Sequence, residues 1–140
     1  MKYEPITAGN YYHIYNRENN LKDIFKESRK FSNLFNSYAK GINKAYNRNG
    51  SLFQDRFSRK RIGNEDYLKN LILYVHLNPV HHGFTEEYNS YSYSSYRSHL
   101  STRKTLLDRK FVTDLFGGKQ NFEAAHLQKS INLSQELTLE

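Results

Sequence analysis

The sequence predicts an α+β fold in which two short strands are packed with three to four helices. Residues 11–15 are β-prone and lie between the turn dipeptide Gly9-Asn10 and a polar loop. Residues 52–62 alternate partly between apolar and charged side chains, as a half-exposed strand does. Between these runs, apolar residues from Phe31 to Tyr46 recur at three-and-four spacing, which predicts a helix with one apolar face.

A second helix is expected from about residue 65 to residue 77. Asn64 is a suitable N-cap, and the acidic residues that follow it favour the positive end of the helix dipole. The helix must stop near Asn78, because Pro79 biases the residue before it away from helical conformation.

The remainder of the chain is predicted to be helical, with one long connection. Residues 88–96 are rich in Ser and Tyr and are expected to form an ordered loop. Further helices are predicted at about residues 110–116 and 122–131. We therefore expect one domain at residues 1–100, followed by a helical extension at residues 101–140.

The helix at residues 65–77 carries a tyrosine at the margin of its apolar stripe. The stripe consists of Leu68, Leu71, Ile72 and Val75. Tyr74 lies beside it, where a tyrosine buries its ring and presents its hydroxyl, and in the simplest interpretation it only covers the core edge. Leu73 and Leu77 lie off the stripe, so this helix is expected to be covered on two faces, for example by a second subunit.

The composition excludes several classes of protein. The chain has 140 residues, which suits a single domain with a modest core. It has no cysteine, so it holds neither a disulfide nor a thiolate metal site. No stretch is apolar enough for a membrane span or a signal peptide, which predicts a soluble, cytoplasmic protein without a membrane partner.

Positive charge is concentrated in one segment. Of the chain's net charge of +7, residues 40–61 carry +6, with seven Lys or Arg residues against Asp55 alone. Aromatic residues Tyr46, Phe53 and Phe57 are interspersed among these cations. A solvated basic face is the plain alternative, but this combination favours a nucleic acid partner, because cations bind phosphates and rings stack on bases.

Four short motifs lie in the first 100 residues. They are Tyr12-His13-Ile14-Tyr15-Asn16-Arg17; Gly50-Ser51-Leu52-Phe53-Gln54-Asp55-Arg56-Phe57; Asn64-Glu65 and Tyr67-Leu68 with Tyr74-Val75-His76-Leu77-Asn78-Pro79-Val80 and Gly83-Phe84; and Tyr91-Ser92-Tyr93-Ser94-Ser95-Tyr96. Together they resemble the REP-associated and insertion-sequence tyrosine transposases, the single-tyrosine members of the HUH class. Their blocks read Gly-Ser-Leu-(Phe/Trp)-Gln-x-Arg-Phe and Tyr-Ile-His-Leu-Asn-Pro-Val. Tyr93 stands where that family has tryptophan.

The resemblance implies a ferredoxin-like sheet and a function in DNA transposition. It places Tyr74 at the position of the catalytic tyrosine, whose phenolate attacks a phosphate of single-stranded DNA and becomes joined to the 5′ end. It also implies hairpin-bearing DNA as the partner, a homodimer as an assembly, and Mg²⁺ or Mn²⁺ as the cofactor. The residues expected to bind DNA are Lys44, Arg48, Phe53, Gln54, Arg56, Arg59, Lys60 and Arg61.

The family's metal-binding His-hydrophobic-His pair is missing. None of the six histidines, which are His13, His76, His81, His82, His99 and His126, stands two residues from another. The chain resembles a member with an internal deletion joined at residues 26–31, where the helical period continues. The first and last strands of the sheet remain, so residues 11–15 and 57–62 are expected to pair and leave an open edge. No metal ligand is therefore assigned.

Several residues in the motifs also have ordinary structural interpretations. Arg56 is equally suited to an ion pair with Asp55 or Glu65, and His13 to a strand position satisfied by a neighbour. His76 is expected at solvent or at an interface. Asn78 and Pro79 suit a device that stops the helix.

Three functions remain open. The first is a DNA-binding protein of the transposase family that has lost or weakened strand cleavage. The second is an active enzyme that takes its metal through His76, His81 or His82, or from a partner subunit. The third is a basic module for RNA binding or protein assembly, without catalysis.

Overall fold

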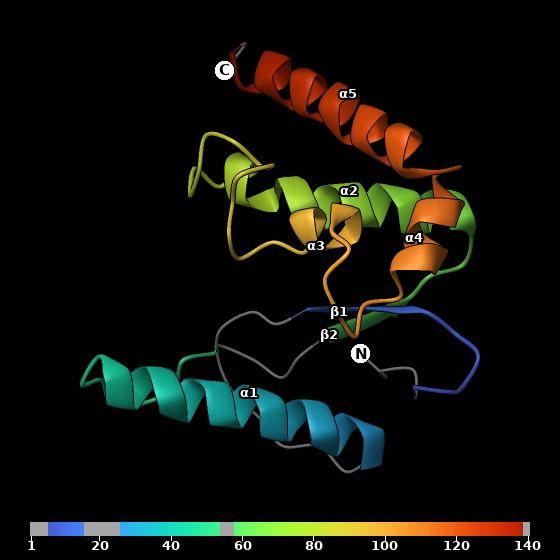
Figure 1. Ribbon diagram of the computed structural model, residues 1–140. Coiled ribbons are helices and arrows are strands. Elements are labelled where there is room, and N and C mark those ends of the chain that lie inside the picture. The colour runs from blue at the N-terminus through green and yellow to red at the C-terminus, as the bar shows by residue number, and fades with distance from the viewer. Residues whose placement is uncertain (1–5, 16–25, 54–57, 139–140) are drawn as a thin grey trace. The chain divides into compact units, whose positions relative to one another are not determined.

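A computed structural model describes residues 6–15, 26–53 and 58–138, and its ribbon is drawn in Figure 1. The chain divides into two compact units, Met1–Gly63 and Asn64–Glu140, which are described separately. The domain boundary expected at residue 100 stays a prediction. In the described part of the chain, no helix is both long enough and apolar enough to span a membrane.

The first unit contains a two-stranded antiparallel sheet. Strands β1 (Tyr12–Tyr15) and β2 (Ser58–Arg61) pair in a register that sets Tyr12 opposite Arg61. The backbone N–H of Ile62 also donates to the carbonyl of Tyr11 at 3.0 Å and extends the ladder by one bond. The pairing predicted between the first and last strands is confirmed, and with the helices it gives the predicted α+β class (Figure 1).

Helix α1 (Lys26–Ala45) runs without a break across the segment where a junction was predicted. Phe53 packs on it, with its ring 5.4 Å from that of Phe35 and 6.3 Å from that of Tyr38. Asn47 ends the helix in the left-handed region, with φ of 50°, and Arg48 N–H donates to the carbonyl of Asn43 at 2.8 Å. This is a Schellman turn, in which asparagine takes the place usually held by glycine.

Helix α2 (Glu65–His81) opens the second unit. The predicted cap is confirmed, because the side-chain oxygen of Asn64 accepts the backbone N–H of Tyr67 at 2.8 Å. The predicted stop near Asn78 is wrong, since the helix continues through Pro79 to His81.

The end of α2 explains why a proline is tolerated there. Pro79 has no backbone N–H, so the helix has one hydrogen-bond donor fewer. The carbonyl of Pro79 nevertheless accepts the N–H of Phe84 at 2.8 Å, and the carbonyl of Val80 accepts the N–H of Gly83 at 3.0 Å. Gly83 has a φ of 70°, which glycine adopts without steric cost. A Schellman turn thus satisfies the last carbonyls of α2, and the helix ends four residues later than Pro79 led us to predict.

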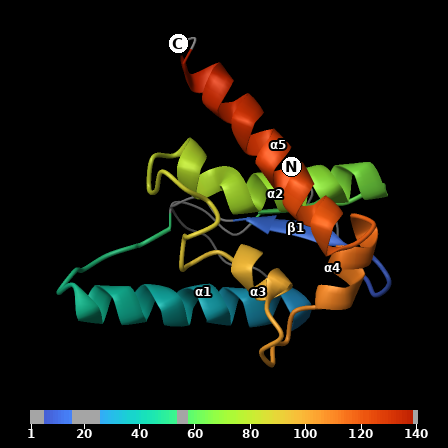
Figure 2. The ribbon, with the colours of Figure 1, turned by 45° about the horizontal axis from the view of Figure 1, so that its top comes forward.

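Three further helices complete the second unit. Helices α4 (Arg109–Leu115) and α5 (Lys119–Thr138) confirm the two helices predicted there, and α5 is longer at both ends. Helix α3 (Tyr96–Leu100) is a short addition that follows the predicted Ser/Tyr loop. Helix α5 packs against α2 and α4, and α3 packs against α4 (Figures 1 and 2).

The core of the second unit is aromatic and centres on α5. Phe122 and His126 are completely buried, and Tyr96 and Leu77 are nearly so. The predicted stripe of α2 is not its most buried face: Leu68, Leu71 and Ile72 are half-buried and Val75 is 49% exposed. The buried residues are Leu73, His76 and Leu77, so the helix is covered on the side where Leu73 and Leu77 were expected to lie off the stripe.

The reason lies in the composition of α2. Residues 68–77 are apolar almost all round, so periodicity does not select one face. Packing against the rings of α5 decides which face of α2 is buried. The ring centre of His76 lies 5.0 Å from that of His126 and 6.0 Å from that of Phe122. His76 is consequently 2% exposed, which corrects the expectation that it would lie at solvent or an interface.

Candidate functional site

Three of the predicted DNA-binding residues form most of strand β2. Arg59, Lys60 and Arg61 follow one another, and the last two are exposed to solvent. Lys60 lies opposite His13 in the ladder, and partial burial together with the charge of Lys60 lowers the pKa of His13. The strand therefore carries three adjacent cations beside a histidine that its surroundings hold neutral.

Two further cations lie near the C-terminal end of α1. Lys44 is in the last turn and Arg48 follows the helix, and both are exposed. Within the described ranges, neither they nor Arg61 has an ion-pair partner. Their charges are thus not neutralised by a described carboxylate, which leaves them available to an anionic ligand.

The predicted aromatic and polar contacts divide into two groups. Phe53 is half-buried by its packing on α1, so its ring contributes to the fold of the first unit. Tyr46 is 71% exposed close to Lys44 in sequence, and it is the better placed ring for stacking on a base. Gln54 and Arg56 lie outside the described residues.

Tyr74 is about half exposed, at 48%, on helix α2. The stripe beside which it was predicted to lie is not the buried face of the helix, so this exposure does not test that prediction. Tyr74 belongs to the second unit, whereas the predicted DNA-binding residues belong to the first. The structure brings three of the predicted cations together on β2.

A chain of hydrogen bonds passes through the core of the second unit. The Nε2 atom of His76 lies 2.7 Å from the hydroxyl of Ser95, and its Nδ1 lies 2.8 Å from Nε2 of His126. The Nδ1 atom of His126 lies 2.7 Å from the carbonyl of Phe122. Sequence reasoning missed this chain, because its members are far apart in sequence and histidine has no periodic signature.

The carbonyl at the end fixes the direction of every bond. A carbonyl only accepts, so His126 Nδ1 carries a proton and its Nε2 accepts when the ring is neutral. His76 must then donate from Nδ1, and its Nε2 accepts the Ser95 hydroxyl hydrogen. Both rings are neutral in this arrangement, and a second proton on either ring would remove an acceptor that the chain needs.

The surroundings favour the neutral rings. Burial, followed by the repulsion of His126 and His99, lowers the pKa of His76 to about 3. Burial likewise lowers the pKa of His126, against the opposing effect of its bond to Phe122. A histidine with so low a pKa is a weak general base at neutral pH, so we interpret the Ser95–His76 pair as structural.

The histidines offered as alternative metal ligands do not form a site. Both ring nitrogens of His76 are engaged in hydrogen bonds. His81 and His82 are exposed neighbours with ring centres 5.1 Å apart. Among the residues the structure describes, no three His, Cys, Asp or Glu side chains gather as ligands. The described histidines therefore do not fit the divalent cation that the family resemblance implies.

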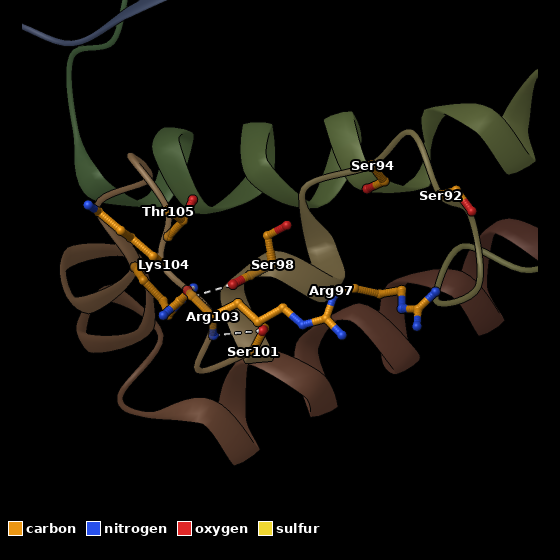
Figure 3. A pocket seen from close by; sticks show the side chains of 9 residues that line it. Ser92, Ser94, Arg97, Ser98, Ser101, Arg103, Lys104 and Thr105 are labelled. Atoms are coloured by element: carbon orange, nitrogen blue, oxygen red, sulfur yellow. Dashed lines mark hydrogen bonds between the residues drawn. The ribbon is translucent and has the colours of Figure 1, made fainter.

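The second unit also contains a pocket of about 560 Å³, shown in Figure 3, which the sequence did not predict. Four cationic residues line it, namely Arg97, Arg103, Lys104 and Arg109. The rest of its lining consists of Ser92, Ser94, Ser98, Ser101 and Thr105. The signal in the sequence was a stretch rich in Arg, Lys, Ser and Thr at residues 97–105, which carries no recognisable spacing.

Comparisons with protein-family models, with curated proteins and with solved structures found no match. The resemblance of the four motifs to tyrosine transposases therefore stays a prediction.

Proposed function

We propose that the chain is a single-stranded DNA-binding protein of the single-tyrosine HUH transposase family, with strand cleavage lost or impaired. The observation that carries the DNA-binding part is the basic strand β2, with Arg59, Lys60 and Arg61 in succession. Residues 1–63 contain 13 cationic and five acidic residues, so the first unit holds the charge that attracts a polyanion.

The exposed rings of the first unit favour an unpaired strand. Tyr46 lies between Lys44 and Arg48 in sequence, and all three are exposed. A ring beside cations binds single-stranded nucleic acid by stacking on bases while the cations bind phosphates. A duplex keeps its bases stacked on one another and offers only its phosphates to such a surface.

The proposal of impaired cleavage rests on the missing metal ligands. A protonated tyrosine hydroxyl is a poor nucleophile without a cation that stabilises the developing charge. The paired histidines that the family uses are missing from the sequence. Both ring nitrogens of His76 are hydrogen-bonded, one to His126 and the other to Ser95.

A homodimer is part of the proposal. Each strand of the described two-stranded sheet pairs on one side only. A second copy can add a strand at the edge of such a sheet.

The test uses the full chain and fluorescent DNA. Single-stranded DNA that bears a hairpin should bind more tightly than a duplex of the same length, and it should form no covalent adduct with Mn²⁺ present. Equal or tighter binding of duplex RNA would favour a module without transposase ancestry. A denaturation-resistant adduct that disappears in Tyr74→Phe would show that cleavage survives, and the impaired part of the proposal would then be wrong.

A further inference from the structure

The cationic pocket of the second unit has no part in the function proposed above. Residues 64–140 contain eight cationic and nine acidic residues, so this unit is not basic as a whole. Half of its cations nevertheless line one pocket, and no Asp or Glu lines it. Four like charges without a counter-charge repel one another, so the arrangement favours an anionic ligand.

Arg109 holds the pocket in shape. Its Nε donates to the carbonyl of Ser98 at 2.8 Å, and its Nη2 donates to the carbonyl of Arg103 at 2.7 Å. These bonds tie the loop that carries Arg103 and Lys104 to helix α3. A guanidinium has five N–H donors, so three are left for a ligand.

The hydroxyl groups around the pocket are arranged as donors. Ser94, Ser101 and Thr105 each accept a backbone N–H on the hydroxyl oxygen, from Tyr96 at 3.2 Å, Arg103 at 3.0 Å and Leu107 at 3.2 Å respectively. The hydroxyl hydrogen of each group remains available, because these bonds use only lone pairs. The lining thus combines fixed cations with spare O–H donors, and this combination suits the oxygens of a phosphate.

Size and exposure indicate what carries that phosphate. A volume of about 560 Å³ exceeds the needs of a single phosphate group. Arg97, Arg103 and Lys104 are exposed, and in the described part of the chain they have no ion-pair partner, so an extended ligand can enter. Tyr93, between the lining residues Ser92 and Ser94, is 89% exposed and offers a stacking surface for an unpaired base.

We propose that this pocket binds the phosphates of a single-stranded nucleic acid, as a second contact apart from the basic strand β2. The inference rests on the proposed function and adds a site to it. Arg97, Arg103 and Lys104 bind the phosphate oxygens, and Arg109 is a positioning residue that keeps the loop in place.

The experiment follows backbone amide shifts of the full chain by NMR during titration with a single-stranded oligonucleotide, and separately with inorganic pyrophosphate. Both probes should cause saturable shifts at Ser98, Ser101 and Arg103. The double variant Arg97→Gln/Arg103→Gln should lose these shifts and reduce the salt slope of oligonucleotide binding by about 1.4, from about 0.7 for each phosphate contact. Lys129→Gln, on the exposed surface of α5, is the control and should behave like the wild type.

The outcomes separate this inference from the proposed function. If the oligonucleotide shifts residues 58–61 but not the pocket, the pocket inference is wrong and the proposed function stands. If it shifts neither, both are wrong. Pocket shifts with pyrophosphate alone would identify a site for small free anions and overturn the strand-binding inference. Circular dichroism checks that the double variant is folded, and Lys104→Gln gives a second, milder variant for the same comparison.

Discussion

Acidification should destabilise the second unit through its buried histidines. His76 and His126 form their hydrogen-bond chain only as neutral rings, and burial lowers the pKa of both. In the unfolded chain these histidines take up protons near pH 6.5, whereas the folded protein resists protonation. The unfolded state therefore binds more protons as the pH falls, and the free energy of unfolding falls with it.

The contribution of His76 can be worked out from its pKa. With an ordinary value of 6.5 and a folded value of about 3, its contribution is complete above pH 6.5 and is lost progressively toward pH 3. At pH 5 the unfolded histidine is almost fully protonated and the folded one almost fully neutral. The loss relative to pH 7.5 is about 2 kcal/mol, at about 1.4 kcal/mol for each pH unit below 6.5.

The assay is urea unfolding at pH 7.5 and pH 5, followed by helical circular dichroism. His76→Gln should be less stable at pH 7.5, because Ser95 and His126 lose a partner, but it should lose less stability on acidification. His82→Gln removes an exposed histidine and should keep the wild-type pH dependence. Equal stability of the wild type at the two pH values would refute the reasoning, as would the same flattening in His82→Gln.

Four substitutions test the local structure, each by thermal unfolding. Asn64→Ala should cost about 1 kcal/mol, because the Tyr67 N–H loses its cap, and an unchanged midpoint would contradict the cap. Gly83→Ala should cost about 1 kcal/mol through its left-handed φ, although its Cβ would meet open space. Gly41→Ala, also in open space but in helix α1, should stabilise by about 0.5 to 1 kcal/mol, and equal effects at the two glycines would overturn the conformational argument. Phe122→Ala should cost about 3 to 5 kcal/mol, since the ring is fully buried, and a loss below 1 kcal/mol would mean that this core is misassigned.

Local patterns in the sequence were sufficient for most elements of the fold. The continuous α1, the cap at Asn64, and helices α4 and α5 follow from composition, period and turn chemistry. The pairing of the two strands was instead predicted from the topology that the family resemblance implies. The proline rule failed at Pro79 because it describes a steric bias against helical conformation at Asn78, which the rest of the structure overrides. It does not include the turn at Gly83, which satisfies the carbonyls that follow.

Local sequence patterns could not predict the buried face of α2 or the cationic pocket. An almost entirely apolar helix gives no preferred side, so only its packing partner decides that Leu73 and His76 are buried. That partner, α5, begins more than 40 residues further along the chain. The pocket likewise depends on Arg109, whose two bonds to backbone carbonyls close the loop, and such bonds have no sequence signature. For the predicted site, Tyr74 is about half exposed, and its chemistry stays a prediction.

The most direct test of the proposed function is the salt dependence of binding to hairpin-bearing single-stranded DNA. The five described cations of the first unit, which are Lys44, Arg48, Arg59, Lys60 and Arg61, contribute about −3.5 to the slope of log affinity against log salt, at about 0.7 for each phosphate. The triple variant Lys44→Gln/Arg48→Gln/Arg61→Gln should reduce its magnitude by about 2, with Lys129→Gln unchanged. Weak binding with a slope near zero, or a triple variant that keeps the wild-type slope, would contradict the assignment of DNA binding to this unit.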